Sequence, residues 1–90
     1  MKETRQLKDL VSVGPAMIRD FLLLGISTVE QLVDREPENL YNELQMRRGQ
    51  KIDICCLDVF VVAIKQARNP NLPPEQCQWH YWSKIRKAKK

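Results

Sequence analysis

The segment from Asp53 to Arg68 constrains the fold of this 90-residue chain more than any other feature. Its apolar residues recur at helical spacing and cover most of the circumference of the helix. A helix of this kind is surrounded by other elements, because water would otherwise contact its apolar side chains. Asp53 suits the N-cap, and we expect Asp58 and Lys65 to mark a thin exposed side. The segment therefore predicts the central helix of an all-α domain.

Shorter helical segments precede this central helix. Proline is favoured in the first turn of a helix and glycine just after its last turn, so both residues mark helix ends. Pro15 and Gly25 bound one helix in this way, and Pro37 opens another. No strand pattern competes with this interpretation. The periodicity predicts a compact bundle of about five helices, over residues 4–11, 15–24, 29–33, 37–46 and 53–68.

The C-terminal part of the chain follows a proline-rich link. Residues 75–82 carry Trp79, Tyr81 and Trp82, and we expect this aromatic strap to cover the core as a lid. Residues 83–90 hold five cations and no acid, which predicts a disordered basic tail after a single domain of residues 1–82. The net charge of +4 belongs to this tail, because residues 1–82 hold ten basic and eleven acidic side chains.

Composition also limits the classes of protein and the kinds of site that this chain can form. No stretch approaches the roughly 18 apolar residues of a membrane span, and no signal peptide is evident, so we expect a cytoplasmic protein without membrane contact. Three cysteines argue against a disulfide framework, and Cys55 and Cys56 are expected to be buried, reduced thiols. Cys77 and His80 have a zinc-like spacing but lack further donors, so we expect no metal or cofactor. His80 is the only histidine and no catalytic set can be assembled, which argues against an enzyme.

A tight turn between two short helices, at residues 10–15, offers a candidate phosphate site. Successive N–H groups in a glycine turn, together with the positive end of the next helix, attract an anionic oxygen without any charged side chain. Contacts of this kind hold the phosphate backbone and read no base sequence. The Ser12 hydroxyl is a further possible donor, whereas Pro15 removes one amide. The candidate residues of this first corner are Ser12, Val13, Gly14, Ala16, Met17 and Arg19.

A second corner lies between the helix over residues 37–46 and the central helix. It carries more positive charge than the first, with Arg47, Arg48 and Lys51 around Gly49. If the two corners are related by pseudo-symmetry, they would lie side by side and follow two phosphate backbones. The alternative interpretation is that Gly49 is only a helix C-cap and that the three cations are solvated. The basic tail adds further candidate phosphate contacts, at Lys84, Arg86 and Lys87.

The sequence resembles the helix-hairpin-helix superfamily and, more particularly, the small bacterial proteins of the pathogenicity-locus family, which are also labelled mitomycin-resistance-like. The likeness extends over about residues 7–84 and rests on the motifs at residues 7–15, 24–32, 36–41, 53–55 and 59–60, with Gly49, Trp79 and Trp82. It implies an all-helical fold of tandem helix-hairpin-helix (SAM-like) type and DNA binding. The chain departs from the superfamily pattern at Ser12, where a first glycine is usual, and at residues 15–17, where DNA-binding members often carry Lys or Arg.

Two functions follow as expectations. The first is a non-enzymatic module that binds the DNA phosphate backbone without sequence preference, through hairpin amides and basic residues. The alternative is a protein-interaction adaptor with the same fold and no nucleic-acid binding, since fold does not fix function. A positive face that joins both corners would favour DNA, whereas a contiguous apolar patch on the aromatic strap would favour a protein partner.

Overall fold

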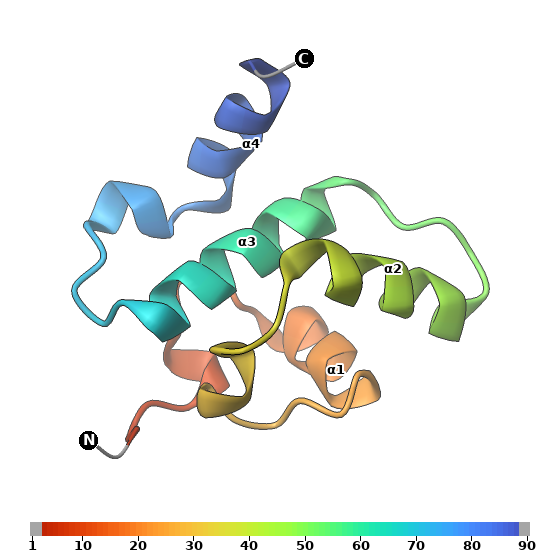
Figure 1. Ribbon diagram of the computed structural model, residues 1–90, viewed down its shortest axis with the longest axis horizontal. Coiled ribbons are helices and arrows are strands. Elements are labelled where there is room, and N and C mark those ends of the chain that lie inside the picture. Colours follow the sequence, from red (N-terminus) through yellow and green to blue (C-terminus); the bar gives the residue numbers. More distant parts are fainter. Residues whose placement is uncertain (1–2, 89–90) are drawn as a thin grey trace.

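A computed structural model describes residues 3–88, and within this range the chain forms four α-helices, three single 3-10 turns and no strand. The all-α prediction is confirmed. None of the helices in this part of the chain has the length and apolar content needed to cross a membrane. The elements, in chain order, are η1 (Leu7–Asp9), α1 (Pro15–Leu23), η2 (Glu30–Leu32), α2 (Pro37–Arg48), α3 (Cys55–Arg68), η3 (Pro74–Cys77) and α4 (Trp79–Ala88) (Figure 1).

Proline and glycine set the ends of the first two α-helices, as the sequence predicted. Pro15 and Pro37 occupy the first turns of α1 and α2, where a missing N–H leaves no hydrogen bond unmade. Gly25 and Gly49 follow the ends of these helices with φ of 80° and 68°, in the left-handed region that glycine enters without steric penalty. Helix α2 continues to Arg48, two residues beyond the predicted end.

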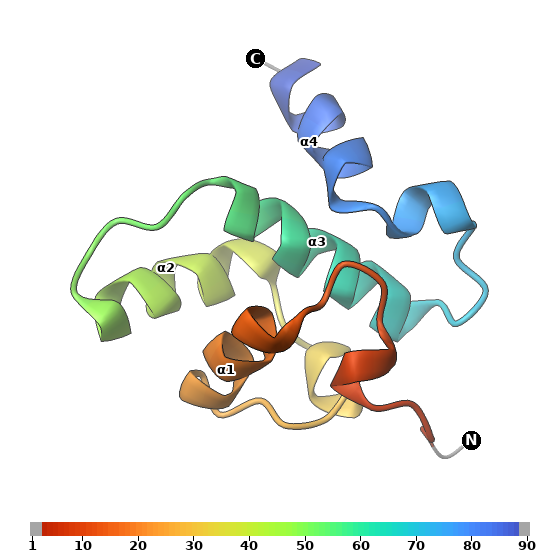
Figure 2. The same cartoon turned by 180° about the vertical axis from the view of Figure 1, so that it is seen from behind.

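Helix α3 is the central helix, as predicted. It packs against α2, α4, η2 and η3, and Figures 1 and 2 show it running through the middle of the molecule between α4 and the pair α1 and α2. Phe60 of α3 and Phe21 of α1 meet with ring centroids 5.4 Å apart, and neither ring is accessible to solvent. Leu32 of η2 and Leu40 and Leu44 of α2 are also fully buried in the core.

The structure differs from the sequence prediction at two short segments. Residues 4–11 and 29–33 were predicted as helices, but each contains only one 3-10 turn. A helix this short has too few hydrogen bonds to offset the entropy of its first turn. Hydrogen bonds from side chains to the backbone hold these segments, where a longer helix would have backbone hydrogen bonds. The Asp9 carboxylate accepts the Gln6 N–H, and the Gln31 side chain accepts the N–H groups of Ser27 and Thr28.

The C-terminal segment differs more strongly from the prediction. Residues 83–88, expected in a disordered tail, continue helix α4 to Ala88, and residues 89 and 90 lie outside the described range. Contacts with α3 stabilise this helix, since Ser83 is buried and Arg86 forms an ion pair with Asp58. Asp58 was expected to face solvent, yet only 1% of its surface is exposed.

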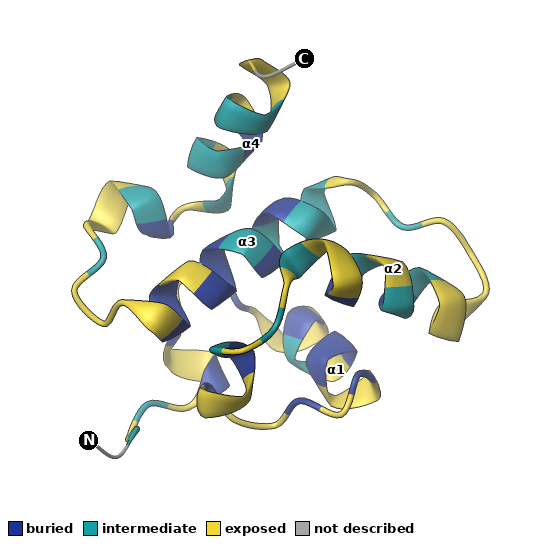
Figure 3. Ribbon diagram, viewed as in Figure 1, coloured by how far each residue is buried: buried dark blue, intermediate teal, exposed yellow. Residues whose placement is uncertain are grey.

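The aromatic side chains of α4 are not a lid over the main core. Trp79, Tyr81 and Trp82 are each half-buried, and the principal core cluster includes no residue of α4. Figure 3 shows most of α4 in the colours of partial burial and exposure, in contrast to the buried inner faces of α1 and α3. Helix α4 is therefore a peripheral element that lies on one side of α3.

Candidate nucleic-acid interface

In the first corner, the serine adopts the left-handed backbone conformation that would be expected of the glycine, and the glycine is extended. Ser12 adopts φ of 72° in the left-handed region, whereas Gly14 is extended, with φ of −98° and ψ of −178°. The Ser12 hydroxyl donates to the carbonyl oxygen of Cys77 at 3.0 Å and accepts the N–H of Trp79 at 3.2 Å. The hydroxyl is thus bound to the start of α4. Its predicted role as a donor to phosphate is wrong in this conformation.

A second contact fastens the same turn to α3. The Gln66 side chain accepts the N–H of Val11 at 2.9 Å and donates to the carbonyl oxygen of Val11 at 2.8 Å. Gln66 is itself buried and lies near the C-terminal end of α3. The turn at residues 10–14 is therefore held at two consecutive positions: at Val11 by the Gln66 side chain of α3, and at Ser12 by its own hydroxyl, which bonds to the backbone of Cys77 and Trp79.

The start of α1 keeps some of the predicted donors. The N–H groups of Ala16 and Met17 fall in the first turn of α1, where a helix provides no acceptor. A Cβ atom placed on Gly14 would meet nothing within 4 Å, so this side of the turn is open. The side chains of Val13 and Met17 point into the core, and Arg19 is exposed on α1. The first corner can offer backbone amides to an anion, with Arg19 as the next cation along the chain.

The second corner offers few free amides. Gly49 N–H donates to the carbonyl oxygens of Gln45 and Met46 at 2.9 and 3.3 Å, and the Gln45 side chain accepts the N–H of Ile52 at 3.0 Å. At the start of α3, the N–H of Cys55 is bound by the Asp53 carboxylate at 2.9 Å. Gly49 is therefore a helix C-cap, which was the alternative interpretation, and its amide is not available to a phosphate.

The cations of the second corner are partly neutralised. Arg47 pairs with Glu43 at 2.9 Å within α2, and Arg48 lies 3.7 Å from the Asp20 carboxylate of α1. Asp20 is only 8% exposed and lies beneath Arg48. Lys51 is exposed in the loop that leads to α3. The positive charge of this corner is therefore smaller than the sequence indicated.

The two corners lie at opposite ends of α3. Gln66 holds the first corner near the C-terminal end of α3, while Asp53 accepts the N–H of Cys55 at the N-terminal end. A rise of 1.5 Å per residue places Cys55 and Gln66 about 16.5 Å apart along the helix axis. Figures 1 and 2 both show the loop over residues 49–54 beyond the N-terminal end of α3. The corners do not form the single amide surface that pseudo-symmetry suggested.

Helix α4 carries the third group of cations that the sequence predicted as phosphate contacts. These cations lie on two different faces of the helix. Arg86 forms two hydrogen bonds with the Asp58 carboxylate, at 2.9 and 3.0 Å, and this interaction raises the pKa of Arg86. Arg86 therefore fixes α4 on α3, with its Nε and Nη2 groups engaged inside the fold and its charge balanced by Asp58. His80, Lys84 and Lys87 are exposed at spacings of four and three residues, so they lie along one face of the helix. We call these three residues the α4 stripe.

The cysteines do not form a reactive or metal-binding centre. Cys55 and Cys56 are half-buried, not buried as predicted, because they lie in the first turn of α3 at the edge of the core. The hydrogen bond with Asp53 raises the pKa of Cys55, and burial raises the pKa of Cys56, so both thiols are poor nucleophiles. Within residues 3–88, no group of three or more His, Cys, Asp or Glu residues could hold a metal ion.

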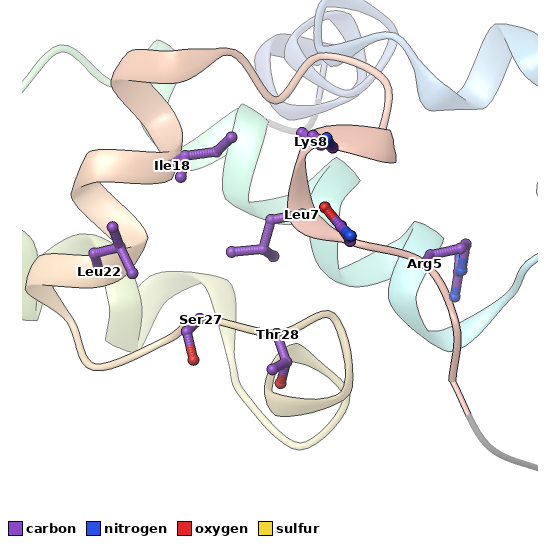
Figure 4. Close-up of a pocket in the computed structure, with 8 residues that line it drawn as sticks. Arg5, Leu7, Lys8, Ile18, Leu22, Ser27 and Thr28 are labelled. Atoms are coloured by element: carbon purple, nitrogen blue, oxygen red, sulfur yellow. The ribbon is translucent and has the colours of Figure 1, made fainter.

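An apolar groove lies at the edge of the core, beside α1. It encloses about 300 Å³ between η1, α1 and residues 27–28, and the side chains of Leu7, Ile18 and Leu22 converge on it in Figure 4. Leu22 is apolar and yet 56% exposed. Lys8 stands at the edge of the groove. Periodicity alone could not identify this groove, because it depends on how η1 packs beside α1.

Comparisons with known proteins agree with the resemblance seen in the sequence motifs. Residues 1–88 match a family described as the pathogenicity locus. The chain is also 39% identical over 75 residues to the mitomycin resistance protein McrB of Streptomyces lavendulae, a match that covers 83% of this chain and 69% of that relative. No solved structure gives a significant match.

Proposed function

This chain belongs to the pathogenicity-locus family, and we propose that it is a non-enzymatic module that binds nucleic-acid phosphates without sequence preference. We place the main contact on helix α4, with the first corner and Lys51 as additional contacts. We also assign the turn between η1 and α1 to the helix-hairpin-helix type of SAM-like folds. The name of the relative refers to mitomycin resistance, and we take from it no ligand or reaction.

The α4 stripe is the observation that carries this proposal. Lys84 and Lys87 are exposed, and α4 contains no acidic residue between Trp79 and Ala88. By contrast, Arg47 and Arg48 are already paired with carboxylates of the same domain. An anionic polymer would meet uncompensated positive charge on α4, and its phosphates would displace only solvent and counterions.

The salt dependence of duplex binding tests this proposal. Each phosphate contact contributes a slope of about −0.9 to the dependence of log K on log salt concentration. Removing both lysines, with Lys84→Gln and Lys87→Gln, should therefore reduce the slope by about two units and weaken binding at low salt. Fluorescence anisotropy of a labelled 20-base-pair duplex gives both quantities.

A charge-matched control separates a defined surface from net charge. The double substitution Lys8→Gln and Lys51→Gln removes two other exposed cations, one outside the proposed interface and one at its secondary contact. We expect it to affect binding less than the α4 pair does. Equal losses in the two double variants, or no duplex binding by the unmodified protein at low salt, would refute a site centred on α4.

The groove beside α1 favours a second candidate function, a protein-interaction adaptor. Leu22 and Leu23 are 56% and 44% exposed next to this groove, and exposed apolar clusters of this kind occur at protein interfaces. A Leu22→Asp variant distinguishes the candidates, because it removes apolar surface far from the α4 stripe. Unchanged duplex binding by this variant, together with loss of a cellular partner, would favour the adaptor.

A further inference from the structure

Ser12 holds a backbone conformation that its side chain disfavours. Among residues 3–88 it is the only non-glycine residue with positive φ, at 72°. The left-handed region brings Cβ too close to the following carbonyl oxygen, with a penalty of roughly 1–2 kcal/mol for an ordinary residue. Strain of this kind persists only where surrounding contacts determine the conformation.

The contacts that determine it come from the far end of the chain. The Ser12 hydroxyl bridges the carbonyl oxygen of Cys77 and the N–H of Trp79, which are 65 and 67 residues away in sequence. Trp79 is the first residue of α4, and its N–H is one of the four that a helix cannot satisfy internally. Ser12 therefore serves as a cap for α4 that is supplied by the hairpin turn and not by the residue before the helix.

Contacts with α3 and η3 fix the rest of α4. Within the described residues the helix packs extensively on α3 and also on η3, although it contributes nothing to the principal core cluster. Its last turns are held by Arg86 on Asp58, and its middle by Trp82, which donates to the Gln76 carbonyl at 2.7 Å. The first turn of α4 is held by the Ser12 hydroxyl, which accepts the N–H of Trp79. Figure 2 shows the turn at residues 10–14 passing below the junction of η3 and α4.

We propose that Ser12 is a positioning residue that joins the hairpin turn to α4, so that the two move as one unit and the α4 stripe keeps a fixed direction. The nucleic-acid consequence rests on the proposed function of that stripe. The structural consequence does not, because it concerns only whether the Ser12 hydroxyl holds the first turn of α4.

Three substitutions at this position separate the hydroxyl from the strain. Ser12→Ala removes the hydroxyl and keeps the strain, whereas Ser12→Gly removes both. Ser12→Thr keeps the hydroxyl but adds a branched Cβ, which the left-handed region tolerates less well. Gly14→Ala is the matched control in the same turn, since Gly14 is extended and an added Cβ meets nothing within 4 Å.

Amide hydrogen exchange of the full chain then tests the positioning role. We expect exchange at Trp79 and Ser83 to become about tenfold faster in the Ala and Gly variants, and to stay near the unmodified rate in the Thr variant and in Gly14→Ala. The proposal is overturned if protection of α4 follows the overall stability of each variant, with Gly at least as protected as Ser and Thr the least protected. Unchanged exchange in all variants overturns it as well.

Duplex affinity provides the second readout. The Ala and Gly variants should bind a labelled duplex severalfold more weakly, although they keep Lys84 and Lys87, while the Thr variant should bind as the unmodified protein does. Faster exchange of α4 with unchanged affinity would refute the link between α4 position and binding. If the unmodified protein binds no duplex, the proposed function fails, and the exchange pattern still decides whether Ser12 positions α4.

Discussion

Gln66→Met tests how the hairpin turn is held against α3. The Gln66 side chain is buried, and it forms hydrogen bonds of 2.9 and 2.8 Å with the N–H and carbonyl oxygen of Val11. Methionine has a similar volume and shape, so the substitution removes these hydrogen bonds with little change in packing. The experiment therefore isolates the polar contact that fixes the first corner.

The expected loss in the free energy of unfolding follows from the number of these hydrogen bonds and from their exposure to water. A hydrogen bond within a protein contributes about 0.5–1.5 kcal/mol net, so two bonds give about 1–3 kcal/mol. Val11 is 42% exposed, so water can reach the backbone groups that the substitution leaves unpaired. We therefore expect a loss in the lower half of this range. The third contact of Gln66, with the Val62 carbonyl at 3.3 Å, adds little because it is longer.

Urea denaturation followed by tryptophan fluorescence measures this loss as a change in the free energy of unfolding. Gln78→Met is the matched control, because Gln78 is exposed, and it should change stability by less than about 0.5 kcal/mol. A Gln66→Met variant as stable as the unmodified protein would show that the turn does not depend on this contact. A loss well above about 3 kcal/mol would show that the substitution disturbs the core as well.

Three further predictions follow from local geometry. Gly49→Ala should lower the free energy of unfolding by about 1–2 kcal/mol in thermal or urea denaturation, because φ is 68° at this position. Asp53→Asn should lower the pKa of Cys55 and accelerate its reaction with a disulfide reagent at neutral pH, since the Asp53 contact raises that pKa. The hydrogen bonds from Arg5 lower the pKa of Glu3 from 4.5 to about 2, so their stabilising effect should be complete above pH 4.5 and disappear as the pH falls to 2. Acid titration of Glu3→Gln beside the unmodified protein measures this effect.

Local rules predicted the parts of the fold that depend on neighbouring residues. Pro15 and Pro37 fix φ and lack an N–H, so they mark helix starts in any tertiary setting. Glycine at position 49 permits the left-handed conformation that ends α2. The apolar circumference of α3 likewise required neighbours on several sides, and α2, α4, η2 and η3 provide them.

Contacts between distant residues explain what the sequence did not predict. Asp58 is buried because Arg86 reaches it from 28 residues away, and Ser12 bonds to groups 65 and 67 residues away. No periodicity or spacing reveals such pairs. The length of α4 was predictable in principle, because Trp79, Trp82, Ser83 and Arg86 follow helical spacing, but the basic composition of residues 83–90 suggested disorder.

The sequence indicated which residue types occur in the candidate site, but not how those residues are arranged. Lys84 and Lys87 are exposed and available, whereas Arg47, Arg48 and Arg86 form ion pairs with acidic residues of other turns or elements. An isolated sequence shows where cations occur, but not which of them are neutralised after folding. The sequence hypothesis spread the phosphate contacts over both corners and the basic tail, and the exposed lysines of α4 support the proposal that α4 is the main contact.

Amide chemical-shift mapping with a short duplex at low salt tests the central claim most directly. The account predicts that the largest shift changes occur in α4, between Trp79 and Ala88, with smaller changes near Gly14 and Lys51. Changes confined to the groove at Leu7, Ile18 and Leu22, or no changes at any concentration of duplex, would contradict it.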